Sequence, residues 1–384
     1  MTELILVLNA GSSTLKFALH DARSDGPAVL RGVIDLFNDA PVMHLGGEDI
    51  QIPSQVASDK GELFRWLIDF LPSRVDGAEI MAGAHRVVHG GRAFTGAVRI
   101  TPDVLAKIRD LAPLAPAHQP ANIAGIEALE AARPGLPQIA CFDTAFHRSQ
   151  PRIAQLYALP RSLIDDGVLR YGFHGLSYEY IAGALPDGLR GNPQARIIAL
   201  HLGHGASVCA MRGGRSVATS MGFTALDGLV MGKRCGDLDP GVVLHLIRDR
   251  GMSVGEAETL LAEQSGLLGV SGISHDMREL LASDDPHARE AVGLFVYRAC
   301  AQIGAMAAAL GGVDTIVFAG GIGEHAAPVR KEICEGCAWL GLMLDESANE
   351  RGEERISALD SKMQALIIRT DEEAVIAHHA RQLL

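Results

Sequence analysis

The chain has few aromatic residues and no excess of positive charge, and each shortage excludes a class of protein. Aromatic residues make up 5% of its 384 residues, so Ala, Leu, Ile, Val and Gly supply the apolar content, as in α/β proteins. The 34 basic residues are outnumbered by 46 acidic ones, and the formal net charge is −12. This balance argues against a nucleic-acid or membrane-surface partner, although local arginines can still bind an anionic substrate.

Long hydrophobic runs and a cysteine framework are also lacking. We find no apolar stretch that approaches the roughly 20 residues of a membrane span, and Glu3 precedes a first run too short for a signal h-region. We therefore expect a cytoplasmic protein. The six cysteines lie mostly in apolar surroundings, which favours buried free thiols. Cys334 and Cys337 have metal-site or redox spacing, but a second Cys/His pair is missing.

What the chain does have is a pattern that occurs twice. An apolar run, a polar Gly/Ser turn and a second apolar run follow one another over residues 4–16 and again over residues 197–209. Gly11 aligns with Gly205, and Ser13 with Ser207. Such strand–turn–strand units present backbone N–H groups and small hydroxyls, which suit phosphate oxygens. Two of them predict two related domains that hold one polyphosphate.

Short apolar runs alternate with helical stretches, which predicts an α/β fold. No low-complexity linker interrupts the chain, so we expect two lobes around a cleft, with a boundary near residues 147–151. Helices are expected over 101–111, 287–310 and 373–384, and Ser253-x-x-Glu256 predicts a capping box. Strands are expected over residues 5–8, 17–19, 80–87, 138–142, 197–202, 207–211, 315–319 and 365–368.

Three polar residues follow or interrupt apolar strands in a way that suggests chemistry. Arg86 near a strand end could clamp a carboxylate with two hydrogen bonds, or form a structural ion pair. Asp143 ends another strand, where it could hold Mg²⁺, act as a base or cap a helix. His174 lies between glycines and is a candidate donor to a transferring phosphoryl group, although a lone histidine is usually structural.

Glycine-rich segments supply the remaining candidates. Residues 221–240 form a structured loop with Lys233 and Arg234 side by side, followed by Asp237 and Asp239, which could simply cap the next helix. Gly320, Gly321 and Gly323 follow a strand and lead into a helix, so a nucleotide could lie against the backbone there. Residues 371–373 offer a metal carboxylate or a solvated helix start.

Taken together, these ordered motifs resemble the acetokinase family, over nearly the whole chain. The resemblance implies two duplicated ribonuclease H-like lobes of the actin-like ATPase superfamily. It also implies reversible phosphoryl transfer from ATP to acetate, giving acetyl phosphate and ADP, with Mg²⁺ or Mn²⁺ and usually as a homodimer. The expected lobes are residues 1–147 with 373–384, which carry the acceptor site and the first phosphate element, and residues 148–372, which bind the nucleotide.

The resemblance also assigns roles to individual positions. The catalytic residues would be Asp143, His174 and Arg234, and the metal residues Asn9 and Glu372. The acceptor would contact Arg86, Val88, Ala117, Phe173 and Ala225. The nucleotide and its phosphates would contact Ser12, Lys16, His201, Leu202, Gly203, His204, Gly205, Asp276, Met277, Arg278, Gly321, Ile322, Gly323, Glu324 and His325.

Several positions depart from the family pattern. His204 and His325 replace asparagines, and Lys233 replaces a threonine beside Arg234. Ala117 and Ala225 replace a larger Leu and Pro, which would enlarge the acyl pocket. Since a buried methylene is worth about 0.8 kcal/mol, a preference for propionate or butyrate is the alternative to acetate. A hydroxyl-acceptor kinase would instead need a general base and polar acceptor contacts, and an ATP-driven chaperone or filament protein would need an extra domain.

Overall fold

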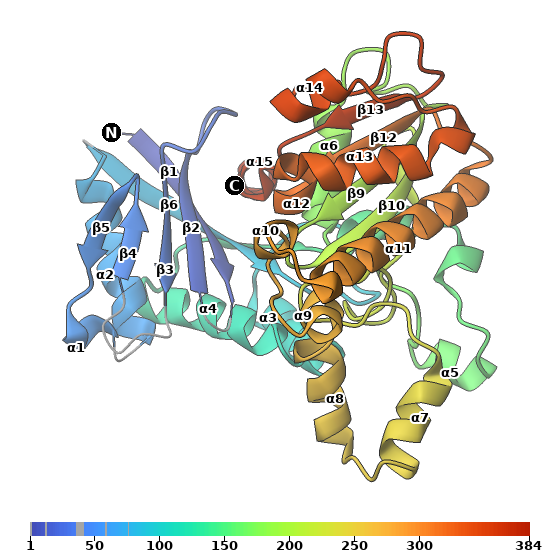
Figure 1. Cartoon of the computed structure of the whole chain (residues 1–384). Helices are drawn as coiled ribbons and strands as arrows, with labels where there is room; N and C mark the ends of the chain where they lie inside the picture. The colour runs from blue at the N-terminus through green and yellow to red at the C-terminus, as the bar shows by residue number, and fades with distance from the viewer. Residues whose placement is uncertain (1, 12–13, 36–41, 58–59, 76) are drawn as a thin grey trace. The chain divides into compact units, whose positions relative to one another are not determined.

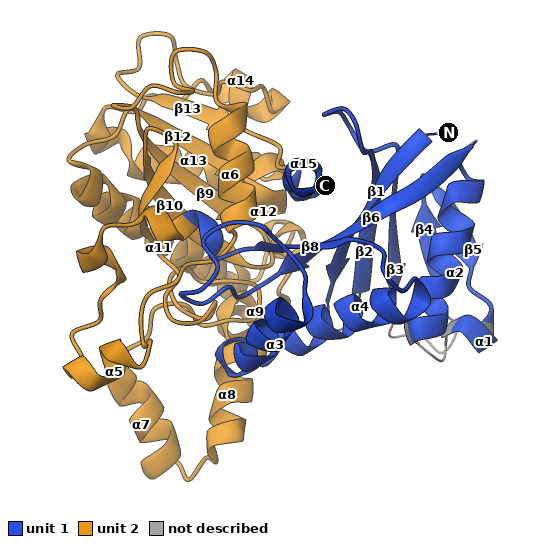
Figure 2. Ribbon diagram, turned by 180° about the vertical axis from the view of Figure 1, so that it is seen from behind, with its two compact units in different colours: residues 1–146, 371–384 blue, residues 147–370 orange. Residues whose placement is uncertain are grey.

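The computed structural model describes residues 2–11, 14–35, 42–57, 60–75 and 77–384, which form two compact units (Figures 1 and 2). Unit 1 comprises residues 1–146 and 371–384, and unit 2 comprises residues 147–370. Each unit combines one mixed sheet with helices, which confirms the α/β class.

Unit 1 is built on an eight-stranded sheet in the order β5-β4-β3-β2-β1-β6-β8-β7. β1 to β5 pair antiparallel, whereas β6 lies parallel to β1 and β8 parallel to β6. Residues 4–8 of the central strand β1 are buried on both faces, and helices α4 and α15 contact this strand. The strands are β1 (Thr2–Ala10), β2 (Thr14–Asp21), β3 (Leu30–Asp35), β4 (Val42–Leu45), β5 (Glu48–Gln51), β6 (Ala78–Val87), β7 (Val98–Arg99) and β8 (Gln138–Phe142).

The helices of unit 1 include the C-terminal one, which returns to the first strands. The expected helix over 373–384 is α15 (Glu372–Leu383), and it contacts β1, β2, β6 and β8. Thr101 caps α3, since its side chain accepts from the N–H of Val104. The other helices are α1 (Ser54–Ala57), α2 (Lys60–Ser73), α3 (Pro102–Asp110), α4 (Gln119–Ala132) and two short 3₁₀ turns at Ala112–Leu114 and Ala145–Ser149.

Unit 2 repeats the strand arrangement of unit 1. Its sheet order is β11-β10-β9-β12-β13, with β9, β10 and β11 antiparallel and β12 and β13 parallel to β9. This is the order of β3-β2-β1-β6-β8, so the duplication predicted from the twin turns is confirmed. The strands are β9 (Arg196–Leu202), β10 (Ala206–Arg212), β11 (Arg215–Thr219), β12 (Thr315–Ala319) and β13 (Gln364–Ile367).

The helices of unit 2 are α5 (Arg161–Asp165), α6 (Gly175–Ala184), α7 (Pro240–Arg248), α8 (Val254–Glu263), α9 (Gly266–Ser271), α10 (Met277–Leu281), α11 (Pro286–Leu310), α12 (Gly320–His325), α13 (Ala327–Gly336) and α14 (Glu346–Arg351), with short 3₁₀ turns at Arg152–Gln155 and Ala338–Leu340. The predicted capping box is present: Ser253 and Glu256 each accept a backbone N–H of the other at the start of α8. Asp239 caps α7.

The long helix α11 corrects one expectation. By length and composition alone it could cross a membrane, so the statement that no apolar stretch approaches such a span is wrong. The apolar content has a packing explanation, because Phe295, Ala299 and Ile303 are buried and the helix contacts α9, α13 and β10. The apolar residues of this helix therefore form a core face.

Candidate active site

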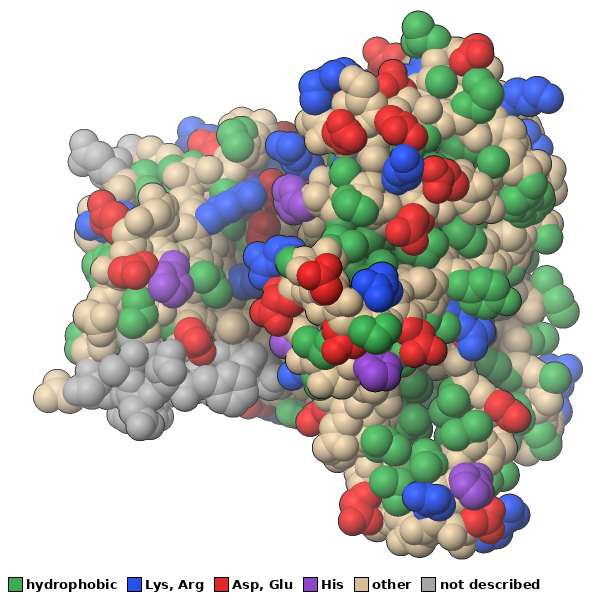
Figure 3. Space-filling view, in the orientation of Figure 1, with side chains coloured by type: hydrophobic (Ala, Val, Ile, Leu, Met, Phe, Trp, Pro, Cys, Tyr) green, Lys and Arg blue, Asp and Glu red, His purple; other side chains and the backbone are tan. Residues whose placement is uncertain are grey.

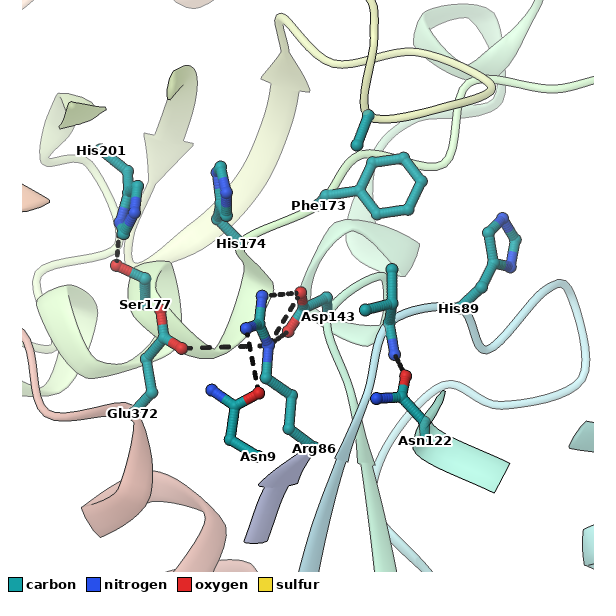
Figure 4. A network of polar contacts seen from close by, with 12 residues as sticks. Asn9, Arg86, His89, Asn122, Asp143, Phe173, His174, Ser177, His201 and Glu372 are labelled. Atoms are coloured by element: carbon teal, nitrogen blue, oxygen red, sulfur yellow. Dashed lines mark hydrogen bonds and ion pairs between the residues drawn. The ribbon is translucent and has the colours of Figure 1, made fainter. Parts of the chain in front are cut away.

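The first group of candidate residues lies where the parallel strands of unit 1 end. β1, β6 and β8 are neighbours, so their carboxyl ends meet at one edge of the sheet. Asn9 lies near the end of β1, Arg86 near the end of β6, and Asp143 directly after β8. Glu372 is the first residue of α15, which packs on the same strands. Figure 4 shows these four side chains converging.

Arg86 is the centre of this group. Its Nε–H donates to Oδ1 of Asp143 at 3.0 Å and its Nη2 to Oδ2 at 2.6 Å. Nη1 lies 3.4 Å from Oδ1 of Asn9, and Nε lies 4.0 Å from Oε2 of Glu372. The side chain of Asp143 is 2% exposed and that of Arg86 21%. The ion pair is thus bidentate and largely buried.

The charges of this group depend on one another. Burial lowers the pKa of Arg86, but the carboxylates of Asp143 and Glu372 outweigh it and raise this pKa overall. Burial raises the pKa of Asp143, and the Arg86 guanidinium opposes that rise. Because the carboxyl accepts hydrogen bonds from two guanidinium nitrogens, its oxygens are poorly placed to remove a proton from a substrate.

Oxygen donors that suit a hard cation lie in the same group. Asn9 offers an amide oxygen, and Asp143 and Glu372 offer carboxylates. Among the described residues, no group of three or more His, Cys, Asp or Glu side chains is arranged to hold a metal ion. Mg²⁺ is usually bound through one or two carboxylates together with water and substrate phosphates, so the donors that are present fit this ion.

Side chains of α4 fix the loop that follows Arg86. Asn122 accepts from the backbone N–H of Val88 at 3.0 Å and donates to the carbonyl oxygen of Ala10 at 2.8 Å. Gln119 accepts from the N–H of His89 at 3.1 Å and donates to its carbonyl oxygen at 3.0 Å. The end of β1 and the end of β6 are therefore tied to one helix. Neither side chain was predicted from the sequence, although buried polar residues in a helix are a signal for such contacts.

The first phosphate turn is described only in part. Gly11 donates its N–H to the carbonyl oxygen of Thr14 at 2.8 Å, and Lys16 on β2 pairs with Asn9 on β1. Lys16 is exposed to solvent. Ser12 and Ser13 lie outside the described residues.

The second turn, in unit 2, joins β9 to β10. Gly203 donates its N–H to the carbonyl oxygen of Gly205 at 3.0 Å. Gly320 follows β12 with φ of +74°, and a Cβ there would lie 2.7 Å from the carbonyl oxygen of Leu202. Only glycine fits this position without strain, so the start of α12 can approach the turn closely.

Three predicted nucleotide segments meet at one cavity of about 530 Å³ in unit 2. Its lining includes Gly203 and His204 from the second turn, residues 276–278 at the start of α10, and Gly321, Ile322 and His325 from α12. The other predicted nucleotide residues of unit 2 do not line this cavity. His201 and Leu202 belong to β9, Gly323 is buried in α12, and Glu324 accepts the N–H of Gly320 at 3.1 Å.

His174 and Arg234 approach the second turn. His174 has φ of +57°, the one positive value among the non-glycine residues that the structure describes. A Cβ built on Gly205 would lie 3.2 Å from Nε2 of His174 and 3.7 Å from Nη1 of Arg234. Arg234 also donates to the carbonyl oxygen of Ala225 at 3.2 Å. The structure thus brings the two side chains to one glycine of the turn.

Three histidines line this cavity, among them His204 and His325. The rings of His204 and His275 lie 5.2 Å apart, and His325 is a third lining residue. Burial lowers the pKa of His204, and Arg234, His275 and Lys233 lower it further. His204 is therefore neutral at neutral pH, where it can act as a donor or an acceptor.

The predicted acceptor contacts are divided between the units. In unit 1, Val88 is buried, whereas Ala117 is exposed in the turn before α4. In unit 2, Phe173 is buried and Ala225 is half-buried.

The remaining motifs have structural partners. All six cysteines are free thiols, including Cys334 and Cys337, as expected. Asp237 accepts from the N–H of Gly228 at 3.0 Å and from Gln302 at 2.6 Å, so it fixes the 221–240 loop. Asp371 caps α15.

Comparison with known proteins agrees with these features. The sequence profile of the acetokinase family matches residues 4–378. An acetate kinase from Rhodopseudomonas palustris is 52% identical over 100% of this chain and 99% of its own length. Among solved structures, a propionate kinase from Francisella tularensis has a TM-score of 0.93 at 37% identity, with all of both chains covered. An acetate kinase from Porphyromonas gingivalis has a TM-score of 0.86 at 35% identity, with 98% of each chain covered.

Proposed function

The chain belongs to the acetokinase family, which makes it a kinase that transfers a phosphoryl group to a carboxylate, and we propose that its acceptor is acetate. The reaction is the reversible, Mg²⁺-dependent transfer from ATP that gives acetyl phosphate and ADP, by direct in-line displacement. The single observation that best supports the proposal is the cavity of unit 2, to which three distant predicted nucleotide segments contribute.

Arg86 is proposed to bind the acceptor carboxylate. Asp143 uses Nε and one hydrogen of Nη2, so the Nη1–Nη2 edge of the guanidinium offers a second pair of donors with the geometry of a carboxylate. Asp143 then acts by orienting Arg86. An acetate-like acceptor is ionised near pH 7 and needs no base, whereas a hydroxyl acceptor would. The engagement of Asp143 by Arg86 therefore favours a carboxylate over a sugar hydroxyl.

His174 and Arg234 are proposed to stabilise the transition state. The transferring group spreads negative charge over its equatorial oxygens. The two side chains meet at Gly205 of the second turn, where Nε2–H and Nη1–H could donate to those oxygens. Asn9 and Glu372 would hold the metal ion, which neutralises phosphate charge when bound. Lys16, Ser12 and the second turn would contact the phosphates of ATP, and residues 276–278 and 321–325 the nucleoside.

The two lobes are proposed to bind different substrates. Residues 1–147 with 373–384 would carry the acceptor and first phosphate element, and residues 148–372 would bind the nucleotide.

The small side chains of Ala117 and Ala225 favour a second candidate, a kinase that accepts propionate or butyrate as readily as acetate. An extra methylene is worth about 0.8 kcal/mol, or roughly fourfold in kcat/KM, if the pocket has room for it.

A cytoplasmic homodimer is proposed as the working form. Apolar side chains are exposed on and beside the helical hairpin of α7 and α8, among them Leu238, Leu244 and Val254, with exposures of 39, 60 and 71%. Figure 3 shows hydrophobic side chains gathered over this hairpin. A self-complementary contact between two copies would cover such a surface.

A hydroxamate-trapping assay with Mg²⁺-ATP tests the function. The values of kcat/KM are compared for acetate, propionate, butyrate and glycerol, with a chelator as the metal control. Trapped hydroxamate from acetate, lost with the chelator, supports the proposal. Equal or higher values with the longer acids would favour the second candidate, and ADP release with glycerol alone would contradict both.

A further inference from the structure

A chain of hydrogen bonds joins His174 to two buried hydroxyl groups. Nδ1 of His174 lies 2.9 Å from Oγ of Ser207, and that oxygen lies 2.5 Å from the hydroxyl of Tyr178. Ser207 and Tyr178 are fully buried. His174 opens α6, Tyr178 lies one turn further along the same helix, and Ser207 is the second residue of β10. The chain therefore connects α6 and the sheet at the second turn.

The direction of these hydrogen bonds follows from their last member. The hydroxyl of Tyr178 is buried, so its proton needs an acceptor, and Oγ of Ser207 lies within hydrogen-bond distance of it at 2.5 Å. Burial raises the pKa of Tyr178 well above its usual range, so this proton is retained. Ser207 accepts it and turns its own O–H toward Nδ1 of His174.

We propose that Tyr178 and Ser207 are positioning residues that hold His174 in the tautomer with its proton on Nε2. A neutral imidazole carries one N–H, and a donor at Nδ1 requires Nδ1 to be the acceptor. The proton then lies on Nε2, the nitrogen that faces Gly205 of the second turn. The inference rests on the proposed function only for its consequence, which is that His174 is ready to donate to the transferring phosphoryl group without rearrangement.

A neighbouring pair provides an internal control. The ring of His201 stacks on that of His174 with centroids 4.3 Å apart, and Nδ1 of His201 lies 2.7 Å from Oγ of Ser177 (Figure 4). Two stacked histidines thus each have a serine hydroxyl at Nδ1, but from different elements. The variants Ser207→Ala and Ser177→Ala remove the same atom beside different rings.

The tautomer is measured by ¹H–¹⁵N NMR on the full chain with ¹⁵N-labelled histidine, in the absence of substrates. The His174 signals are assigned by their loss in His174→Gln. We expect the wild-type pattern of protonated Nε2 and unprotonated Nδ1. In Ser207→Ala the ¹⁵N chemical shifts of Nδ1 and Nε2 of His174 should move toward each other. Ser177→Ala should change the signals of His201 and leave those of His174 in place. Protonated Nδ1 in the wild type, or unchanged His174 shifts in Ser207→Ala, would overturn the proposal.

A second variant keeps the test independent of folding. Tyr178→Phe removes the first donor of the relay and keeps the ring, and Tyr171→Phe is its match, since Tyr171 is also buried and donates to the carbonyl oxygen of Gly167 at 2.8 Å. We expect a mixed tautomer in Tyr178→Phe alone. If the chain is a kinase, kcat in Ser207→Ala should fall about tenfold, less than the 10²–10³ of losing a donor outright, with KM for ATP changed by less than about twofold. A normal kcat together with a mixed tautomer would overturn the catalytic consequence, whereas a chain without kinase activity would leave the tautomer result intact.

Discussion

Gly205→Ala tests whether the space between His174 and Arg234 receives the transferring group. Gly205 has no positive φ, so alanine is compatible with its backbone. The new Cβ would lie 3.2 Å from Nε2 of His174 and 3.7 Å from Nη1 of Arg234. A phosphoryl oxygen accepting from Nε2–H would need a distance of about 2.7–3.2 Å, and the methyl group would therefore occupy the place of that oxygen.

The expected loss follows from this displacement. Removing one donor from a developing oxyanion costs about 2.7–4 kcal/mol, or 10²–10³ in kcat. We expect a fall of that size in kcat for Gly205→Ala, measured by hydroxamate trapping with saturating acetate and Mg²⁺-ATP. The melting temperature should change little, because the atoms nearest to the new methyl are side-chain ends that can shift by a few tenths of an ångström.

Gly183→Ala is the matched control. Gly183 lies in α6, and a Cβ there would meet no atom within 4 Å, so this variant should be fully active and slightly more stable, by about 0.5–1 kcal/mol. A Gly205→Ala enzyme with kcat within threefold of the wild type would refute the placement of the phosphoryl group at this turn.

The other predictions concern unit 1. Asp143→Asn leaves the guanidinium of Arg86 without its main counter-charge and should lower the free energy of unfolding by about 3 kcal/mol in urea titrations; an unchanged midpoint would show that the ion pair adds no stability. Asn122→Ala leaves the N–H of Val88 and the carbonyl oxygen of Ala10 unpaired and should lower the free energy of unfolding by about 2–4 kcal/mol in the same titrations. An unchanged free energy would show that water replaces the amide. Burial lowers the pKa of His85 from 6.5 to about 4. Between these two pKa values the unfolded chain therefore binds more protons than the folded chain. The free energy of unfolding should therefore fall as the pH falls from 6.5 to 4, by up to about 3 kcal/mol, and His85→Gln should flatten that dependence.

Local patterns predicted much of the fold. The expected strands 138–142 and 315–319 coincide with β8 and β12, because both are continuous apolar runs between turn residues. Strands β3, β4, β5, β7 and β11 were not predicted, since they are short, partly polar and stabilised by pairing with neighbours. The duplication was predictable because the two turns share a sequence pattern, and five strands of the first sheet follow the same order as the five strands of the second.

The candidate site was predictable as a set of residues but not as a set of contacts. The motifs around Arg86 and Asp143 identified both side chains, yet their mutual ion pair depends on the parallel pairing of β6 with β8. The contacts of Asn122 and the relay through Ser207 and Tyr178 join residues that are 29 to 112 positions apart. No local pattern specifies such distances, because they follow from how the strands and helices pack.

The transfer of ¹⁸O from the acceptor tests the central claim most directly. The chain is incubated with [¹⁸O₂]acetate, Mg²⁺-ATP and hydroxylamine, and the phosphate that hydroxylamine releases from the product is analysed by mass spectrometry. Direct attack of the acetate carboxylate on the γ-phosphorus predicts one ¹⁸O in each phosphate released, with ADP as the other product. Unlabelled phosphate, or label recovered in AMP, would contradict direct phosphoryl transfer from ATP to the carboxylate.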